Sequence, residues 1–160
     1  MRRILPWAAV ILWMALIFFF SAQVAEQSDQ LSKGIAEKIA EAVEKVIPGT
    51  GLVAEGMNHF VRKNAHFLVY LVLGALTVNA FCSSGVRGLK GIAAAMLVCV
   101  LYAASDEIHQ LFVPGRSGQF TDVLIDSAGA AIGSLITGII RRKPRKLESR
   151  RAAMSAEIDG

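Results

Sequence analysis

Long apolar stretches alternate with shorter polar ones along this chain. The apolar stretches cover about residues 4–22, 65–82, 89–108 and 122–140. None shows the strict alternation of apolar and polar positions that a membrane β-strand requires. Each is long enough, as an α-helix, to cross the ~30 Å hydrocarbon layer of a bilayer, where the backbone must satisfy its own hydrogen bonds. The pattern predicts an all-α fold, a polytopic membrane four-helix bundle.

The first apolar stretch follows Arg2 and Arg3, as the core of a signal peptide would. It is longer than the usual core of such a peptide. The segment that follows it, residues 20–25, offers no site with the small-x-small pattern of signal cleavage. We therefore expect an uncleaved membrane helix here rather than a leader peptide.

A polar segment with a helical pattern of its own separates the first two membrane helices. Apolar residues recur at helical spacing from Leu31 to Val46, charges of both signs fill the other face, and Pro48 and Gly49 end the pattern. This indicates an extra amphipathic helix at about residues 30–47. Because its charges are mixed rather than basic, the pattern favours docking on protein over adsorption to lipid.

Basic residues are distributed unequally between the two sides of the predicted bundle. Four crossings place both termini on one side, and that side carries most of the 17 Lys and Arg residues. An excess of Lys and Arg marks the cytoplasmic side. We therefore expect a multi-pass protein with both termini cytoplasmic, so that the amphipathic helix is extracytoplasmic. Residues 1–140 would form the membrane domain, and residues 141–160 a basic cytoplasmic tail that meets anionic lipid headgroups.

Composition narrows the class of protein further. Hydrophobic residues make up 54% of the chain and charged residues 19%, which is more apolar than a soluble domain of 160 residues needs. The net charge of +4 gathers largely in the tail rather than on a folded face, so we expect no nucleic-acid partner. Cys82 and Cys99 lie inside apolar runs without metal-ligand spacing and are expected to be small buried hydrophobes. No cofactor is expected.

Polar residues that are rare in membrane helices gather at the outer ends of the second, third and fourth spans. Arg62 and His66 share one helix face because they are four residues apart, as do Asp122 and Asp126. Ionisable groups at membrane depth usually face the bundle interior and pair with one another. We therefore expect one polar cluster. Its expected members are Arg62, His66, Asp106, Glu107, His109, Gln110, Arg116, Asp122 and Asp126.

This cluster suits several roles, and a purely structural salt-bridge network is one of them. Basic side chains can hold an anion through charge-assisted hydrogen bonds. The ligand-binding candidates are Arg62, Lys63, His66, Gln110, Arg116, Asp122 and Asp126. An acid–base pair for hydrolysis or transfer is the second role. The catalytic candidates are Asp106, Glu107 and His109.

A metal site is the least specific reading of the cluster. Imidazole and carboxylate groups can ligate a divalent metal, and the Asp-x-x-His spacing fits a helix. The metal candidates would be His66, Asp106, His109 and Asp126. Because the chain has no His-Glu-x-x-His motif and no set of Cys ligands, we do not expect a metal.

Two glycines on the last span have a separate role. Gly129 and Gly133 form a Gly-x-x-x-Gly pattern, which lets a membrane helix approach another helix closely. We expect this contact to lie within the bundle.

Taken in order, the polar motifs resemble those of the VanZ-like family of small bacterial integral membrane proteins. The matching stretches are Arg62-Lys63-x-x-His66-Phe67-x-x-Tyr70, Tyr102-x-x-x-Asp106-Glu107-x-His109-Gln110, Gly115-Arg116-x-Gly118 and Asp122-Val123-x-x-Asp126-x-x-Gly129. The resemblance implies a protein of the bacterial cytoplasmic membrane. It also implies a link to glycopeptide resistance, because the family's namesake is associated with low-level teicoplanin resistance that leaves the cell-wall precursor unremodelled.

Residues and resemblance together lead to two functional expectations. The first is an outer-leaflet polar pocket that binds an anionic envelope lipid or modulates glycopeptide susceptibility. The second is an enzyme that acts on a lipid-linked or cell-wall substrate through Asp106, Glu107 and His109. The expected partners are membrane lipids and a lipid-linked cell-wall intermediate or glycopeptide target, and the sequence leaves the oligomeric state open.

Overall fold

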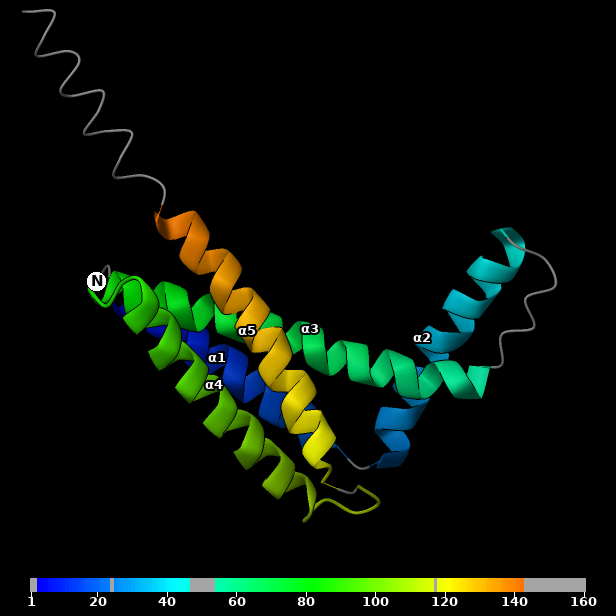
Figure 1. The fold of residues 1–160 in the computed structure, drawn as a ribbon. Coiled ribbons are helices and arrows are strands. Elements are labelled where there is room, and N and C mark those ends of the chain that lie inside the picture. Colours follow the sequence, from blue (N-terminus) through cyan, green and yellow to red (C-terminus); the bar gives the residue numbers. More distant parts are fainter. Residues whose placement is uncertain (1–2, 24, 47–53, 117, 143–160) are drawn as a thin grey trace, which may run out of the picture.

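Five helices account for nearly all of the chain that the structure, a computed structural model, describes: residues 3–23, 25–46, 54–116 and 118–142. The helices are α1 (Ile4–Ser21), α2 (Ala25–Val46), α3 (Ala54–Ser83), α4 (Leu89–Gln110) and α5 (Phe120–Arg142) (Figure 1). Within these described residues, four segments are long and apolar enough to cross a membrane: Ile4–Ser21, Phe60–Ser83, Leu89–Gln110 and Phe120–Arg141. The predicted all-α membrane bundle with one additional helix is therefore confirmed.

Two helices are longer than their apolar patterns. We predicted the second span at residues 65–82, but α3 begins at Ala54, and α2 begins at Ala25 rather than near residue 30. Polar helix-forming residues continue the backbone hydrogen bonding past the point where the apolar pattern ends. The greater part of the expected basic tail and the Pro48-Gly49 stop signal lie outside the described residues.

The pair α3–α5 forms the tightest contact of the bundle. Gly129 and Gly133 of α5 lie directly against the backbone carbonyls of Phe67 and Leu71 on α3, with no room for a Cβ atom at either glycine. On α3, Gly74 lies in the same way against the backbone of Ala130. The Gly-x-x-x-Gly pattern thus serves helix packing within the chain, as predicted.

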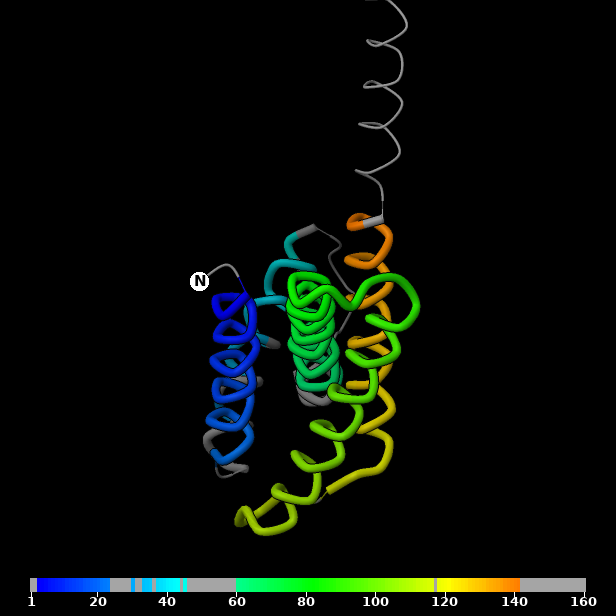
Figure 2. The backbone as a smooth tube through the Cα atoms, turned by 90° about the vertical axis from the view of Figure 1, so that its left-hand side faces the viewer, coloured from blue at the N-terminus to red at the C-terminus, as the bar shows by residue number. Residues whose placement is uncertain are grey.

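The other helices pack around this pair. Figure 2 shows α1 on one side of α3 and α5 on the other, while α4 runs obliquely from the α5 side towards the end of α1. Tyr70 and Leu73 of α3 are fully buried in a core that also holds Val10 and Ile17 of α1. Both cysteines are free and buried, as predicted. Helix α2 packs against α3, while Ile35 on α2 stays 51% exposed.

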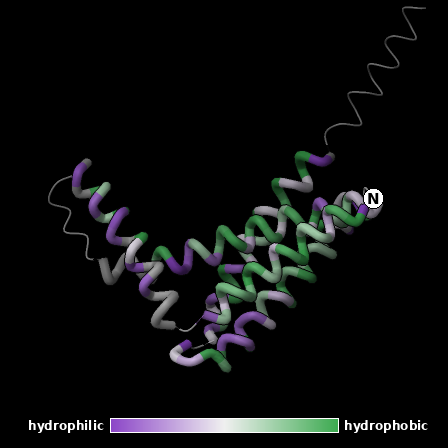
Figure 3. Tube along the Cα trace, turned by 180° about the vertical axis from the view of Figure 1, so that it is seen from behind, coloured by the Kyte–Doolittle hydropathy of each residue, from purple (hydrophilic) through white to green (hydrophobic). Residues whose placement is uncertain are grey.

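The two ends of the bundle hold different helix segments and different polar residues. At one end, the indole Nε1 of Trp7 donates a hydrogen bond to Ser84 Oγ (2.9 Å), and Arg141 donates to Asn79. At the other end, which we call the polar end, lie the end of α1, the first half of the α3 span, the end of α4 and the start of α5. Figure 3 shows hydrophilic residues gathered where α4 meets α5. The candidate residues of the sequence lie at this polar end.

Candidate functional site

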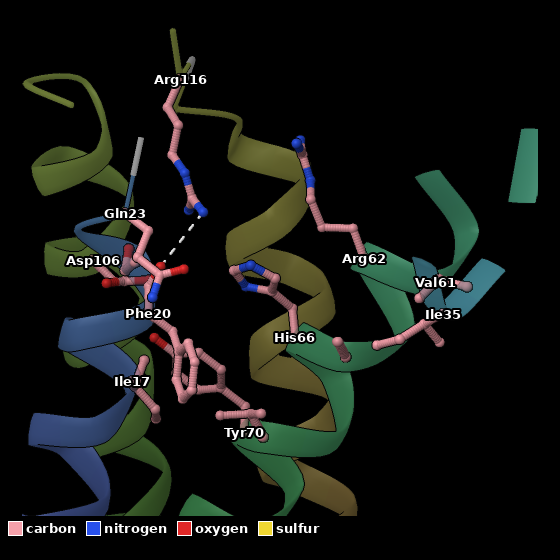
Figure 4. A pocket seen from close by; sticks show the side chains of 13 residues that line it. Ile17, Phe20, Gln23, Ile35, Val61, Arg62, His66, Tyr70, Asp106 and Arg116 are labelled. Atoms are coloured by element: carbon pink, nitrogen blue, oxygen red, sulfur yellow. Dashed lines mark hydrogen bonds between the residues drawn. The ribbon is translucent and has the colours of Figure 1, made fainter. Parts of the chain in front are cut away.

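A cavity of about 370 Å³ opens at the polar end, lined by residues of α1, α2, α3, α4 and the α4–α5 loop (Figure 4). Apolar side chains form much of its wall: Ile17 and Phe20 of α1, Ile35 of α2, and Val61, Ala65 and Val69 of α3. Polar side chains complete the lining: Ser21, Gln23, Arg62, His66, Tyr70, Asp106 and Arg116. The cavity therefore has an apolar and a charged part.

Two arginines reach this cavity from different parts of the chain. Arg62 belongs to α3, and Arg116 enters from the loop between α4 and α5 (Figure 4). The Arg116 Nη2 donates to the backbone oxygen of Phe20 at 3.5 Å, which connects this loop to the end of α1. Gly115, with φ of +77°, provides the left-handed turn just before it. The fold thus places two guanidinium groups beside one apolar wall.

Two pairs, each of a basic and an acidic side chain, join α3 to α5 next to the cavity. His66 Nδ1 lies 3.6 Å from Asp126 Oδ1, and Asp126 is fully buried (0% exposed). One turn nearer the end of the bundle, Lys63 Nζ lies 3.8 Å from Asp122 Oδ1. His66 lines the cavity, whereas Asp126 lies behind it and does not. The predicted helix faces of α3 and α5 therefore do face each other.

Tyr70 and Asp106 bring two further polar groups to the cavity. Asp106 is only 3% exposed, and its Oδ2 accepts a hydrogen bond from Gln110 Nε2 at 3.3 Å. Among the described residues, neither Asp106 Oδ1 nor the Tyr70 hydroxyl has a hydrogen-bond partner. Both residues line the cavity, and both of these atoms are buried.

Glu107 turns away from the cavity and holds the loop that leads to α5. Its Oε2 accepts a hydrogen bond from the backbone N–H of Gln119 at 2.8 Å, and its Oε1 accepts one from Gln110 Nε2 at 3.3 Å. The N–H groups before a helix lack partners within the helix, so a carboxylate there stabilises the helix start. Glu107 and Gln110 therefore shape the polar end without lining the cavity.

His109 also lies apart from the cavity. Its ring stacks on Phe18 of α1, with ring centres 4.5 Å apart. Of the three catalytic candidates, only Asp106 lines the cavity, so the structure does not assemble Asp106, Glu107 and His109 around one space. Within the described ranges, no three His, Cys, Asp or Glu side chains are grouped to hold a metal ion. The four metal candidates therefore form no ligand set.

Four of the residues predicted from the sequence line this cavity, but the other lining residues were not predicted. Arg62, His66, Asp106 and Arg116 all line it. Tyr70 was not among the site candidates, although it lies four residues after His66 on the same helix face. The contributions of α1 carry no comparable signal, because an uncharged helix shows the same apolar residues towards lipid and towards a cavity.

Comparison with known proteins adds one finding. A family model described as VanZ/LLP1 matches residues 6–141, which include all the cavity-lining residues. Comparisons with curated proteins and with solved structures gave no match.

Proposed function

The chain belongs to the VanZ/LLP1 family, and from this premise we propose that its polar-end cavity binds the anionic headgroup of an envelope lipid. The protein would act as a binding component of the bacterial envelope. Through the lipid or lipid-linked cell-wall intermediate that it holds, it would modulate susceptibility to teicoplanin-type glycopeptides.

One observation carries this proposal: two arginines and an apolar wall border the same cavity. A lipid has the same two-part chemistry, with a charged phosphate joined to apolar chains. Arginine holds phosphate well because its planar guanidinium presents paired N–H donors that match two phosphate oxygens. A volume of about 370 Å³ lies within the range of small-molecule sites and suits a headgroup with its first chain carbons.

The neighbouring carboxylates support this role rather than oppose it. Asp122 lies beside Lys63, and Asp126 lies beside His66, so each acid is near a basic side chain on α3. Asp126 is outside the cavity lining, and Asp106 is the acid among the described lining residues. Of these described residues, an anion between Arg62 and Arg116 meets two guanidinium groups and one carboxylate.

Orientation decides which leaflet supplies the ligand. With both termini in the cytoplasm, as the distribution of Lys and Arg predicts, the polar end would lie in the outer leaflet of the bacterial cytoplasmic membrane. The ligand would then be an outer-leaflet lipid or a lipid-linked cell-wall intermediate.

Native mass spectrometry of the detergent-purified protein tests the proposal, with dioleoyl phosphatidylglycerol as the probe. We expect Arg116→Ala to lower the affinity about tenfold or more, the usual effect of losing a charge-assisted hydrogen bond. Arg87→Ala removes an exposed arginine outside the cavity lining and should bind like the wild type. Equal binding by all three folded proteins would refute the proposal.

The alternative function is an enzyme that acts on a lipid-linked substrate, and it now depends on Asp106. Glu107 and His109 do not line the cavity, whereas Asp106 does. Turnover of a lipid-linked cell-wall substrate that is lost in Asp106→Asn, with ligand affinity unchanged, would favour the enzyme.

A further inference from the structure

Three buried polar atoms of the cavity-lining residues have no role in the phosphate site: Ser21 Oγ, the Tyr70 hydroxyl oxygen and Asp106 Oδ1. Two of them belong to α3 and α4, where Tyr70 is 0% exposed and Asp106 is 3% exposed. In the part of the chain that the structure describes, neither atom has a hydrogen-bond partner. A buried polar group without a partner is unfavourable, so such atoms usually face water or a ligand.

Both groups are held in place by the helices that carry them. Gln110 Nε2 donates to the other carboxylate oxygen of Asp106, which leaves Oδ1 for the cavity. The ring of Tyr70 lies in the core of the bundle, 6.3 Å from the ring of Tyr102.

Figure 4 shows Tyr70 below His66, with Arg116 entering from the opposite end of the cavity. Tyr70 lies eight residues after Arg62, about 12 Å further along the helix axis. Tyr70 therefore lies deeper than the arginines.

The hydrogen-bonding capacity of the two groups selects one kind of ligand group. A carboxylate only accepts hydrogen bonds, whereas a phenol both donates and accepts. A ligand hydroxyl satisfies both, because it donates to the carboxylate and accepts from the phenol. An ammonium group only donates, and it would offer the phenol hydrogen no acceptor on the ligand.

We propose that the lipid bound here carries a free hydroxyl in its headgroup, as in a phosphoglycerol or another phosphopolyol. The hydroxyl donates to Asp106 Oδ1 and accepts from the Tyr70 hydroxyl, while the phosphate lies between Arg62 and Arg116. This inference rests on the proposed function, because the arginines position the headgroup whose hydroxyl reaches Tyr70 and Asp106.

Two anionic lipids, one with headgroup hydroxyls and one without, provide the test. Dioleoyl phosphatidylglycerol and dioleoyl phosphatidylethanol have the same chains and the same single negative charge, but phosphatidylethanol has no hydroxyl. In native mass-spectrometric titrations of the full chain, we expect the wild type to prefer phosphatidylglycerol about fivefold or more, the usual effect of one or two buried hydrogen bonds. Tyr70→Phe should reduce this preference to about twofold or less.

The chain offers a matched control, because Tyr70 and Tyr102 are its two tyrosines. The Tyr102 hydroxyl donates to the backbone oxygen of Met14 at 2.6 Å, and Tyr102 does not line the cavity. Tyr102→Phe should therefore keep the wild-type preference. If Tyr70→Phe does not fold, Asp106→Asn replaces it and should lower the preference in the same direction.

The outcomes separate this inference from the proposed function. Equal binding of both lipids by the wild type, or an unchanged preference in folded Tyr70→Phe, would overturn the hydroxyl assignment. So would a stronger preference for dioleoyl phosphatidylethanolamine, which would identify an ammonium as the deeper group. In each case the proposed function stands if binding still falls in Arg116→Ala. If binding does not depend on Arg116, both fail.

Discussion

His66 on α3 and Asp126 on α5 face each other inside the bundle, with Nδ1 and Oδ1 3.6 Å apart. The side chain of Asp126 is fully buried, and that of His66 is 23% exposed. The pair lies beside the glycine contact that joins the same two helices. Removing one member leaves the other desolvated without its partner, which makes breaking a buried polar pair costly.

We expect the effects of His66→Gln and Asp126→Asn on the free energy of unfolding to be non-additive. A double-mutant cycle should give a coupling of roughly 0.5–3 kcal/mol, the range for residues in direct contact. Chemical unfolding in mixed detergent micelles measures it. Lys63 and Asp122 form a more exposed comparison pair, with side chains 30% and 12% exposed, and should couple by less than about 1 kcal/mol. Additive effects at His66 and Asp126 would show that the two do not interact.

Gly133→Ala should destabilise the bundle, because a Cβ there overlaps the backbone oxygen of Leu71. Forcing two packed helices apart typically costs about 1–3 kcal/mol. Thermal unfolding in detergent, followed by circular dichroism, should show a lower Tm. Gly34→Ala on α2 is the matched control, since a Cβ there meets nothing within 4 Å. A Gly133→Ala protein as stable as Gly34→Ala would contradict the tight packing.

Glu107→Ala should loosen the connection between α4 and α5. The substitution removes the acceptors for the Gln119 backbone N–H and the Gln110 side chain, at a cost of about 1–3 kcal/mol. Hydrogen exchange should become faster at the Gln119 amide. The neighbouring Ile108 is 59% exposed, so Ile108→Ala should leave that amide unchanged. Unaltered exchange in Glu107→Ala would show that the carboxylate does not hold the loop.

Orientation in the membrane can be measured with two introduced cysteines. Phe112 in the α4–α5 loop is 80% exposed, and Val86 in the α3–α4 loop is 39% exposed, at opposite ends of the bundle. If both termini are cytoplasmic, a membrane-impermeant maleimide added to right-side-out vesicles should label Phe112→Cys and spare Val86→Cys. The native Cys82 and Cys99 are buried and should react slowly. The opposite labelling would reverse the predicted topology.

The apolar segments predicted the membrane helices well because a bilayer sets their minimum length. The same signal did not locate the start of α3 at Ala54, since a helix that continues into water needs no apolar pattern. The four-residue spacing of Arg62 and His66 predicted that they share one helix face. Both residues line the cavity.

The different contacts of Asp106 and Glu107 could not be predicted from the sequence. The two residues are neighbours in the chain, yet Asp106 lines the cavity and Glu107 accepts the Gln119 N–H. The path of the α4–α5 loop decides which of the two acids lines the cavity and which one accepts the hydrogen bond. The contribution of Ile17 and Phe20 depends in the same way on where α1 lies against α3.

The backbone contact between α3 and α5 also decides how the cavity can adapt to ligands of different size. Because Gly129 and Gly133 leave no space between these two helices, neither can move closer, and moving apart would break the adjoining charged pairs. The wall formed by α3 is therefore the rigid one. A bulkier chain would be accommodated by displacement of α1, α2 or α4, so selectivity for chain width would belong to the cavity-lining helices that carry no member of those pairs.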